Sequence, residues 1–215
     1  PALPERTRGY LKALITVQLK ILGYDLVHEM IPAILDDLYQ VCPVDPMRDS
    51  VQPVSFFYEH HVINRRITAI ERIDLLETLA QEHSVDLFTH IKDFPLPGLN
   101  VHGGVDYFHE MPLVFKRSKI NLNITLRSIR SGIPLRVFDI MGAGGFLLSN
   151  YQADFQDLFV PDEDFVYYES KEDLLRKVGY YLKHEDERKA IARNGHEKIA
   201  AKHTYRHRVK EMLAF

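Results

Sequence analysis

The segment GIPLRVFDIMGAGGFLLSN (residues 132–150) carries the clearest indication of how this chain folds. A helical run beginning at Pro134 precedes Gly142, Gly144 and Gly145, and the apolar segment GFLLSN follows them. In a dinucleotide-binding fingerprint the order is the reverse, because the glycines follow a strand and open a helix. Glycine after a helix accepts the positive φ that ends it. We therefore predict that these glycines turn the chain and do not cradle a phosphate, which removes the main support for a nicotinamide-dependent dehydrogenase.

The amino end of the same predicted helix has the features of an anion site. The preceding strand ends at Thr125, and Pro134 suits the first turn of the helix. A helix start presents unpaired backbone N–H groups and the positive end of the dipole. Arginine offers a planar fork that matches phosphate oxygens, and serine offers a small donor. Such residues in or beside the loop are Arg127, Ser128, Arg130, Ser131 and Arg136.

Asp139 lies about one and a half turns into that helix. A carboxylate there can accept hydrogen bonds from two neighbouring hydroxyls, such as those of a ribose. The alternatives are that the three arginines are solvated on a surface loop and that Asp139 is a surface acid or a cap partner. The sequence leaves both alternatives open.

Strands and helices alternate from Asn64 onward. This rhythm predicts βα units and a parallel sheet, since parallel strands need a crossover helix, and ligands bind outside the carboxyl ends of such strands. The fold class is therefore α/β, a Rossmann-like parallel sheet flanked by helices. The expected strands lie within 85–91, 98–107, 120–125, 145–150 and 165–170. The expected helices lie within 67–83, 106–119, 134–143, 151–159, 170–184, 186–203 and 204–213.

Several helix starts have recognisable capping residues. Thr68 and Glu71 have the spacing of a capping box, and Pro112 suits a first turn. Ser170 is expected as an N-cap before the 171–184 helix, and Thr204 before the last helix.

Residues 1–58 differ from the rest, because they predict helices without strands. Apolar residues recur at helical spacing over 9–40, with breaks expected at Gly23 and Pro32, and the proline-rich segment 41–53 is expected to be a connector. We predict a helical subregion or interdomain segment over 1–58 and a Rossmann-like domain over 59–215. Helices without evident partners allow a homodimer. Because the chain begins at Pro1, we expect a piece of a longer protein.

Composition excludes several classes of function. The formal net charge of -3 argues against a broad nucleic-acid surface, and no apolar run reaches the length of a membrane helix. A single cysteine and no signal-peptide pattern predict a cytoplasmic protein. No metal is expected, because the pairs His60–His61 and His203–His207 have no accompanying ligands of a known metal motif.

Beyond these patterns, the chain resembles a known family over about residues 64–213. The segments that carry the likeness are 85–90, 105–115, 118–151 and 165–213, including the ending "ER..IA..G" followed by "HTY..R". They resemble the carboxyl-terminal domain of GT-B glycosyltransferases, and in particular the bacterial CgeB-like or spore-protein glycosyltransferase-like group.

The resemblance implies a donor-binding domain for a nucleoside-diphosphate sugar. It implies that Asp139 binds the nucleotide ribose, that the loop from Thr125 to Pro134 faces the diphosphate, and that His102 and Gly104 belong to the loop beside the base. It also implies hexosyl transfer without a metal cofactor, with the general base and the acceptor site supplied by another domain. In the family pattern E-x7-E the later acid corresponds to Asp139 and the earlier one to Ser131, so the sugar contact of retaining enzymes does not carry over.

Two functions follow. The first is the donor-binding part of a glycosyltransferase, inactive by itself, that serves an unknown glycan, protein or small-molecule acceptor. The second is a non-catalytic Rossmann-like module in a spore or cell-surface assembly, which the serine at 131 favours.

Overall fold

The computed structural model describes residues 2–45, 52–91, 94 and 96–214. The chain divides into two compact units: Pro1–Asp74 with Leu126–Arg130, called here the helical unit, and Leu75–Thr125 with Ser131–Phe215, called here the α/β unit. This division differs from the predicted one at residue 58, because helix α5 (Asn64–Glu82) contributes to both units. The short segment 126–130 is also placed with the helical unit, which the sequence did not suggest.

The helical unit contains short helices in addition to the first part of α5. They are α1 (Glu5–Gln18), α2 (Leu26–Met30), the 3₁₀ turn η1 (Ile31–Ile34), α3 (Leu35–Val41), α4 (Val54–Phe57) and the π-helical turn η2 (Tyr58–Ile63). The predicted break at Gly23 is confirmed, since this residue has a φ of 80° between α1 and α2. Pro32 instead lies in the first turn of η1, where its missing N–H costs nothing. Of the predicted connector, residues 46–51 lie outside the described residues.

The core of the helical unit is built from one face of each of these helices. Its buried side chains are Leu14, Val27, Ile31, Ile34, Leu38, Tyr58, Ile63 and Ile67. Tyr58 is 1% exposed, and its hydroxyl donates to the carbonyl oxygen of Cys42, which satisfies the polar end of a buried ring. Fully burying each aliphatic side chain contributes about 1.5–3 kcal/mol.

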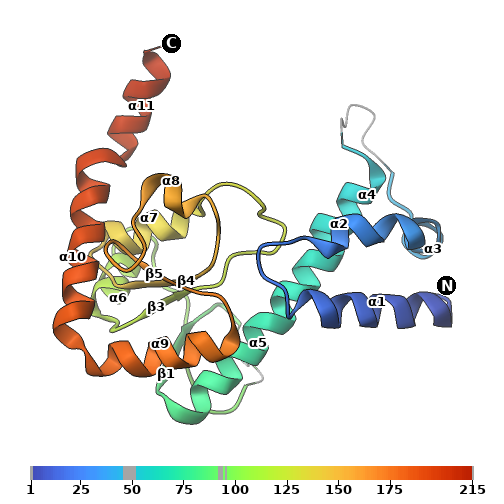
Figure 1. The fold of residues 1–215 in the computed structure, drawn as a ribbon, viewed down its shortest axis with the longest axis horizontal. Coiled ribbons are helices and arrows are strands. Elements are labelled where there is room, and N and C mark those ends of the chain that lie inside the picture. Colours follow the sequence, from blue (N-terminus) through green and yellow to red (C-terminus); the bar gives the residue numbers. More distant parts are fainter. Residues whose placement is uncertain (1, 46–51, 92–93, 95, 215) are drawn as a thin grey trace. The chain divides into compact units, whose positions relative to one another are not determined.

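The α/β unit is built on two parallel sheets, which confirms the predicted fold class (Figure 1). Strands β1 (Val85–Phe88) and β2 (Leu99–His102) pair with each other. Strands β3 (Asn121–Asn123), β4 (Leu147–Asn150) and β5 (Val166–Tyr168) form the second sheet in the order β3-β4-β5. Helices α6 (Met111–Arg117), α7 (Leu135–Gly142) and α8 (Phe155–Leu158) connect the strands, and α9 (Lys171–Lys183), α10 (Glu185–Lys202) and α11 (Tyr205–Leu213) follow the last one.

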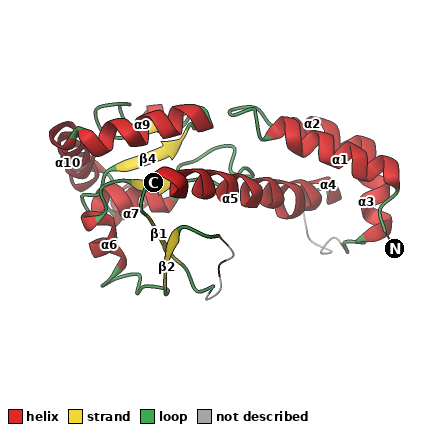
Figure 2. Cartoon of the chain, turned by 90° about the horizontal axis from the view of Figure 1, so that it is seen from below, coloured by secondary structure: helices red, strands yellow, loops and turns green. Residues whose placement is uncertain are grey.

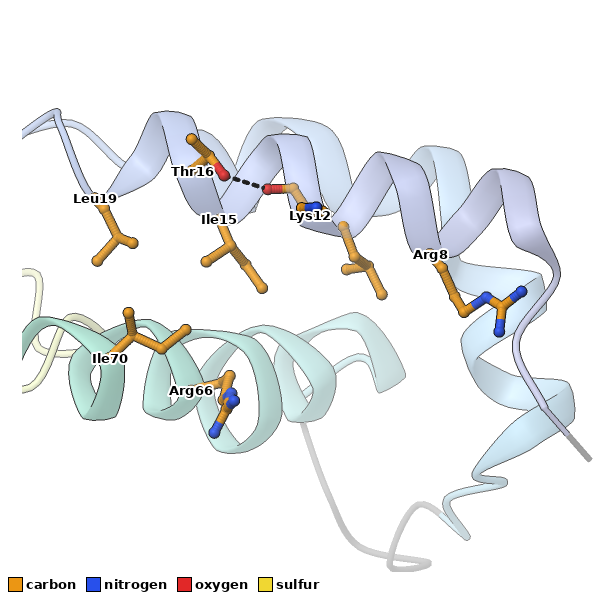
Figure 3. A pocket seen from close by; sticks show the side chains of 8 residues that line it. Arg8, Lys12, Ile15, Thr16, Leu19, Arg66 and Ile70 are labelled. Atoms are coloured by element: carbon orange, nitrogen blue, oxygen red, sulfur yellow. Dashed lines mark hydrogen bonds between the residues drawn. The ribbon is translucent and has the colours of Figure 1, made fainter. Parts of the chain in front are cut away.

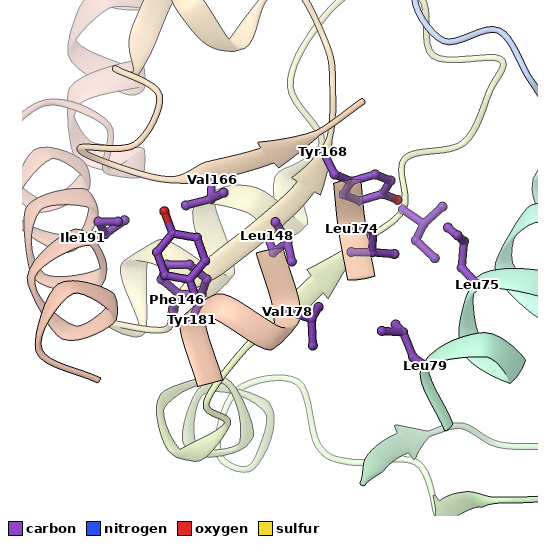
Figure 4. Close-up of a cluster of buried hydrophobic side chains, with 11 residues drawn as sticks. Leu75, Leu79, Phe146, Leu148, Val166, Tyr168, Leu174, Val178, Tyr181 and Ile191 are labelled. Carbon is purple, nitrogen blue, oxygen red and sulfur yellow. The ribbon is translucent and has the colours of Figure 1, made fainter. Parts of the chain in front are cut away.

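Helices cover both faces of the second sheet. Successive residues of a strand point to opposite faces, and β4 buries both Leu147 and Leu148. Leu148 packs with side chains of α9 such as Leu174 (Figure 4), and Leu147 packs with side chains of α7 such as Ile140. Figure 2 shows β4 between these two helices. Both faces of this sheet are therefore buried, and its strands combine apolar side chains such as Leu148 with buried polar ones such as Asn123.

The glycine-rich turn after α7 behaves as the sequence predicted. Gly144 has a φ of 80°, and its N–H donates to the carbonyl of Met141 while that of Gly145 donates to Ile140, both at 2.9 Å. This is the Schellman arrangement that ends a helix. A Cβ at Gly145 would lie 2.8 Å from the carbonyl oxygen of Phe115, so only glycine fits there. These glycines therefore end α7 and turn the chain into β4.

The predicted helix caps have different outcomes. Ser170 accepts from the N–H of Asp173 and caps α9, and Thr204 is the N-cap of α11, so both predictions are confirmed. The capping box at Thr68 is wrong, because α5 already begins at Asn64 and the Thr68 hydroxyl donates to the Asn64 carbonyl at 2.9 Å. The spacing of Thr68 and Glu71 has another cause, described below.

Candidate functional site

The carboxyl ends of β3 and β4 are joined by a buried network of polar side chains. The amide of Asn123 donates to Thr125 at 3.0 Å and to Ser149 at 2.9 Å, and the Thr125 N–H donates to the Asn150 side chain at 2.8 Å. All four residues are at most 5% exposed. A satisfied buried network fixes the positions of its members. Thr125 therefore fixes where the chain leaves β3.

The amino end of α7 is open rather than packed under side chains. Its N-cap is Pro134, which supplies no side-chain hydrogen bond to the first turn. Leu135 is 64% exposed, and Ser131 and Arg136 are exposed as well. Upstream, the Gly132 N–H donates to the carboxylate of Asp154. The first turn of α7 thus keeps backbone donors and one guanidinium available for an anion.

Asp139 has a partner that the sequence did not suggest. Its Oδ1 accepts a hydrogen bond of 2.9 Å from the hydroxyl of Tyr107, which lies between β2 and α6. This bond to Asp139 raises the pKa of Tyr107 and burial adds to the effect, while the charge of Arg136 lowers it. The structure therefore gathers Tyr107, Arg136 and Asp139 in one place.

His102 and Gly104 lie where β2 ends, as predicted. His102 pairs through Nε2 with Asp86 Oδ1 at 2.7 Å, and its ring stacks on Phe88 with centroids 4.6 Å apart. The pair is exposed on both sides, so the carboxylate orients the imidazole without burying it. A side chain at Gly104 would meet the ring of His90, so glycine permits a close approach at this turn.

Arg127 is not free for a ligand, because it is paired within the helical unit. Its Nε and Nη2 donate to the two carboxylate oxygens of Glu71 at 3.0 and 2.7 Å, and Nη1 donates to the carbonyl of Ile21 at 2.9 Å. The Arg127 N–H donates to the Thr68 hydroxyl at 2.9 Å. Thr68 and Glu71 therefore bind Arg127 and do not form a capping box. We accordingly leave Arg127 out of the donor site.

Arg130 also forms salt bridges with carboxylates of the helical unit. Its Nε lies 2.9 Å from Asp25 Oδ2, and its Nη2 pairs with Glu59. The Glu59 side chain is 3% exposed and also contacts His28 Nδ1 at 2.9 Å. A buried carboxylate needs such partners, because an isolated buried charge is costly. Arg130 serves that need, and we leave it out of the donor site as well.

Within the described ranges, no three His, Cys, Asp or Glu side chains gather in a way that could hold a metal ion. An open groove of about 450 Å³ lies between α1 and α5 in the helical unit (Figure 3). It is lined by Arg8, Leu11, Lys12, Ile15, Thr16, Leu19, Arg66 and Ile70. None of the predicted donor residues lines this groove.

The fold and these residues define a class of protein. The α/β unit has two parallel sheets, and helices cover both faces of the β3-β4-β5 sheet. Helix α7 has an open amino end, and Asp139 lies further along it. This arrangement is consistent with a Rossmann-like half of a GT-B fold. A comparison with protein-family models gives a match to the family described as glycosyl transferase-like over residues 58–214. The chain belongs to this family, which supports glycosyl transfer as its general activity. A comparison with curated proteins finds no match. None of the helices in the described part of the chain is long and apolar enough to cross a membrane.

Proposed function

We propose that the α/β unit binds the nucleoside-diphosphate sugar that serves as donor in a glycosyl transfer. The observation that carries this proposal is the open amino end of α7, with Arg136 in its first turn and Asp139 one turn further along. Helix N–H groups and a guanidinium suit a diphosphate, and a carboxylate suits the ribose hydroxyls. The CgeB-like resemblance and a hexose as the transferred sugar remain part of the proposal.

The proposed reaction makes use of this placement of charges. An acceptor hydroxyl oxygen forms a bond to the anomeric carbon, and the bond from that carbon to the diphosphate oxygen breaks. The diphosphate leaves with the electron pair, and the acceptor proton passes to a base. The α7 N–H groups and Arg136 stabilise the charge that grows on the leaving diphosphate. Donor binding by this unit can be tested without an acceptor.

Titration calorimetry with UDP-, GDP- and ADP-sugars tests the proposal directly. At least one of them should bind, and Arg136→Ala should weaken it about tenfold or more, because hydrogen bonds to charged groups contribute roughly 1.5–3 kcal/mol. Arg176→Ala is the matched control, since Arg176 is an exposed arginine of α9 paired with Asp173. Wild-type chain that binds none of the nucleotide sugars at millimolar concentration would overturn the proposal.

The serine at position 131 favours a second candidate, a non-catalytic module. Ser131 is exposed and offers no carboxylate at the place where retaining relatives carry an acid. The double substitution Arg136→Ala with Asp139→Ala distinguishes the two functions. A module used only for assembly should keep its biological role after this change, and a donor-binding enzyme should lose it.

A further inference from the structure

The turn between β2 and α6 holds two aromatic side chains in the open beside the candidate site. Tyr107 is 44% exposed and Phe108 is 77% exposed. Their rings are perpendicular, with centroids 5.1 Å apart. Large apolar side chains that remain exposed together are often ligand or partner contacts. Phe108 is directly next to the tyrosine that binds Asp139, so the exposed pair is adjacent to the carboxylate.

The turn that carries these rings is fixed by its own hydrogen bonds. The carboxylate of Asp106 accepts from the N–H groups of Phe108 and His109 at 3.1 and 2.8 Å, and the Asp106 N–H donates to Glu110 at 2.7 Å. The bonds from His109 hold the pKa of Asp106 below its usual value, so the anchor stays ionised at neutral pH. The rings are therefore presented by an ordered turn that holds them next to α7.

The hydroxyl of Tyr107 constrains Asp139 in a useful way. It donates to Oδ1 at 2.9 Å, and in the described part of the chain no hydrogen-bond partner is assigned to Oδ2. A carboxylate held through one oxygen presents the other in a fixed direction. It can then accept from a ligand hydroxyl without losing side-chain freedom on binding.

From these contacts we propose that Tyr107 and Phe108 form the nucleoside-recognition wall of the donor site. Tyr107 is a positioning residue, which holds Asp139 so that its free oxygen accepts from a ribose hydroxyl. Phe108 supplies a face on which the nucleobase stacks, as aromatic side chains do for single bases. This inference rests on the proposed function, and it adds the residues that orient the carboxylate toward the ribose and stack on the base.

The test measures selectivity, because a merely structural residue would not change it. The probes are UDP, GDP and ADP, the 2′-deoxy form of whichever binds most tightly, and inorganic pyrophosphate, each titrated into the whole chain. Tyr107→Phe keeps the ring and removes the hydroxyl, so it should reduce the preference for ribose over deoxyribose about three- to tenfold. Phe108→Ala should weaken binding of the ribonucleotide about tenfold and leave pyrophosphate binding unchanged. Phe108→Trp should keep the affinity for the ribonucleotide near that of the wild type.

Tyr180→Phe is the matched control. Tyr180 is also a partly exposed tyrosine that donates to a carboxylate, Glu187 at 2.9 Å, but it lies on α9. Its substitution should leave every affinity unchanged. Wild-type affinity and selectivity in Tyr107→Phe and Phe108→Ala, together with weaker binding in Arg136→Ala, would overturn this inference and leave the proposed function standing. A wild-type chain that binds no nucleotide would overturn both.

Discussion

Replacing Glu71 by methionine should destabilise the helical unit strongly. The substitution removes both carboxylate oxygens that accept from Arg127 and leaves a guanidinium whose side chain is 9% exposed without a counter-charge. Breaking a buried pair in this way costs about 3–5 kcal/mol, a large share of the roughly 5–15 kcal/mol that stabilises a domain. For a chain of this length that loss corresponds to about 6–20 °C in Tm.

A double-mutant cycle separates the pair from the loss of packing. Arg127→Met should cost a similar amount, because it leaves Glu71 buried without its partner, and the double variant should cost much less than the sum. Urea unfolding followed by far-UV circular dichroism suits the measurement, since the chain has no tryptophan. The control is Glu211→Met, which removes the partner of Arg208 in an exposed pair and should cost no more than about 1 kcal/mol. A Glu71→Met variant within about 1 kcal/mol of the wild type would refute the reasoning.

Four other substitutions have defined outcomes. Desolvation, reinforced by neighbouring cations, lowers the pKa of His203 in the folded chain. The unfolded chain therefore binds a proton at His203 first, and stability should fall as the pH drops from about 6.5 toward the folded-state pKa. His203→Gln should flatten this dependence of Tm on pH in thermal melts. Ser170→Ala should cost about 1 kcal/mol in urea unfolding through loss of the α9 cap, and an unchanged midpoint would contradict the capping role. Gly195→Ala in α10 should destabilise the chain by about 1–3 kcal/mol, because its Cβ would meet the carbonyl oxygen of Asp164. Gly179→Ala in α9 has open space and should stabilise by up to about 1 kcal/mol, and the opposite order of the two midpoints would show the packing argument to be wrong.

The sequence predicted the strands and helices of the α/β unit well, because local patterns determine them. The segments that form β3, β4 and β5 are largely buried, and the glycines after α7 have the spacing that a helix end requires. Ser170 was found for the same reason, since a cap is a contact between residues three apart. These features depend on neighbours in the chain.

The roles of the arginines could not be predicted in this way, because their partners are distant in the sequence. Arg127 lies 56 residues from Glu71, and Arg130 pairs with Asp25 at the N-cap of α2 and with Glu59 in η2. A cluster of arginines before a helix start suggests an anion site equally well whether or not carboxylates elsewhere in the chain occupy it. The bond between Tyr107 and Asp139 spans 32 residues and was missed for the same reason. The spacing of Thr68 and Glu71 places both side chains on one face of α5, where they bind Arg127 instead of capping a helix.

The membership of residues 126–130 in the helical unit has a consequence for biosynthesis. A chain leaves the ribosome from its amino terminus, and the first helices emerge well before the arginines that neutralise Asp25, Glu59 and Glu71. Until then, these three acids lack the arginines and their charges must be solvated by water. The salt bridges of these arginines in the helical unit can therefore form only after β1, β2 and β3 have been translated.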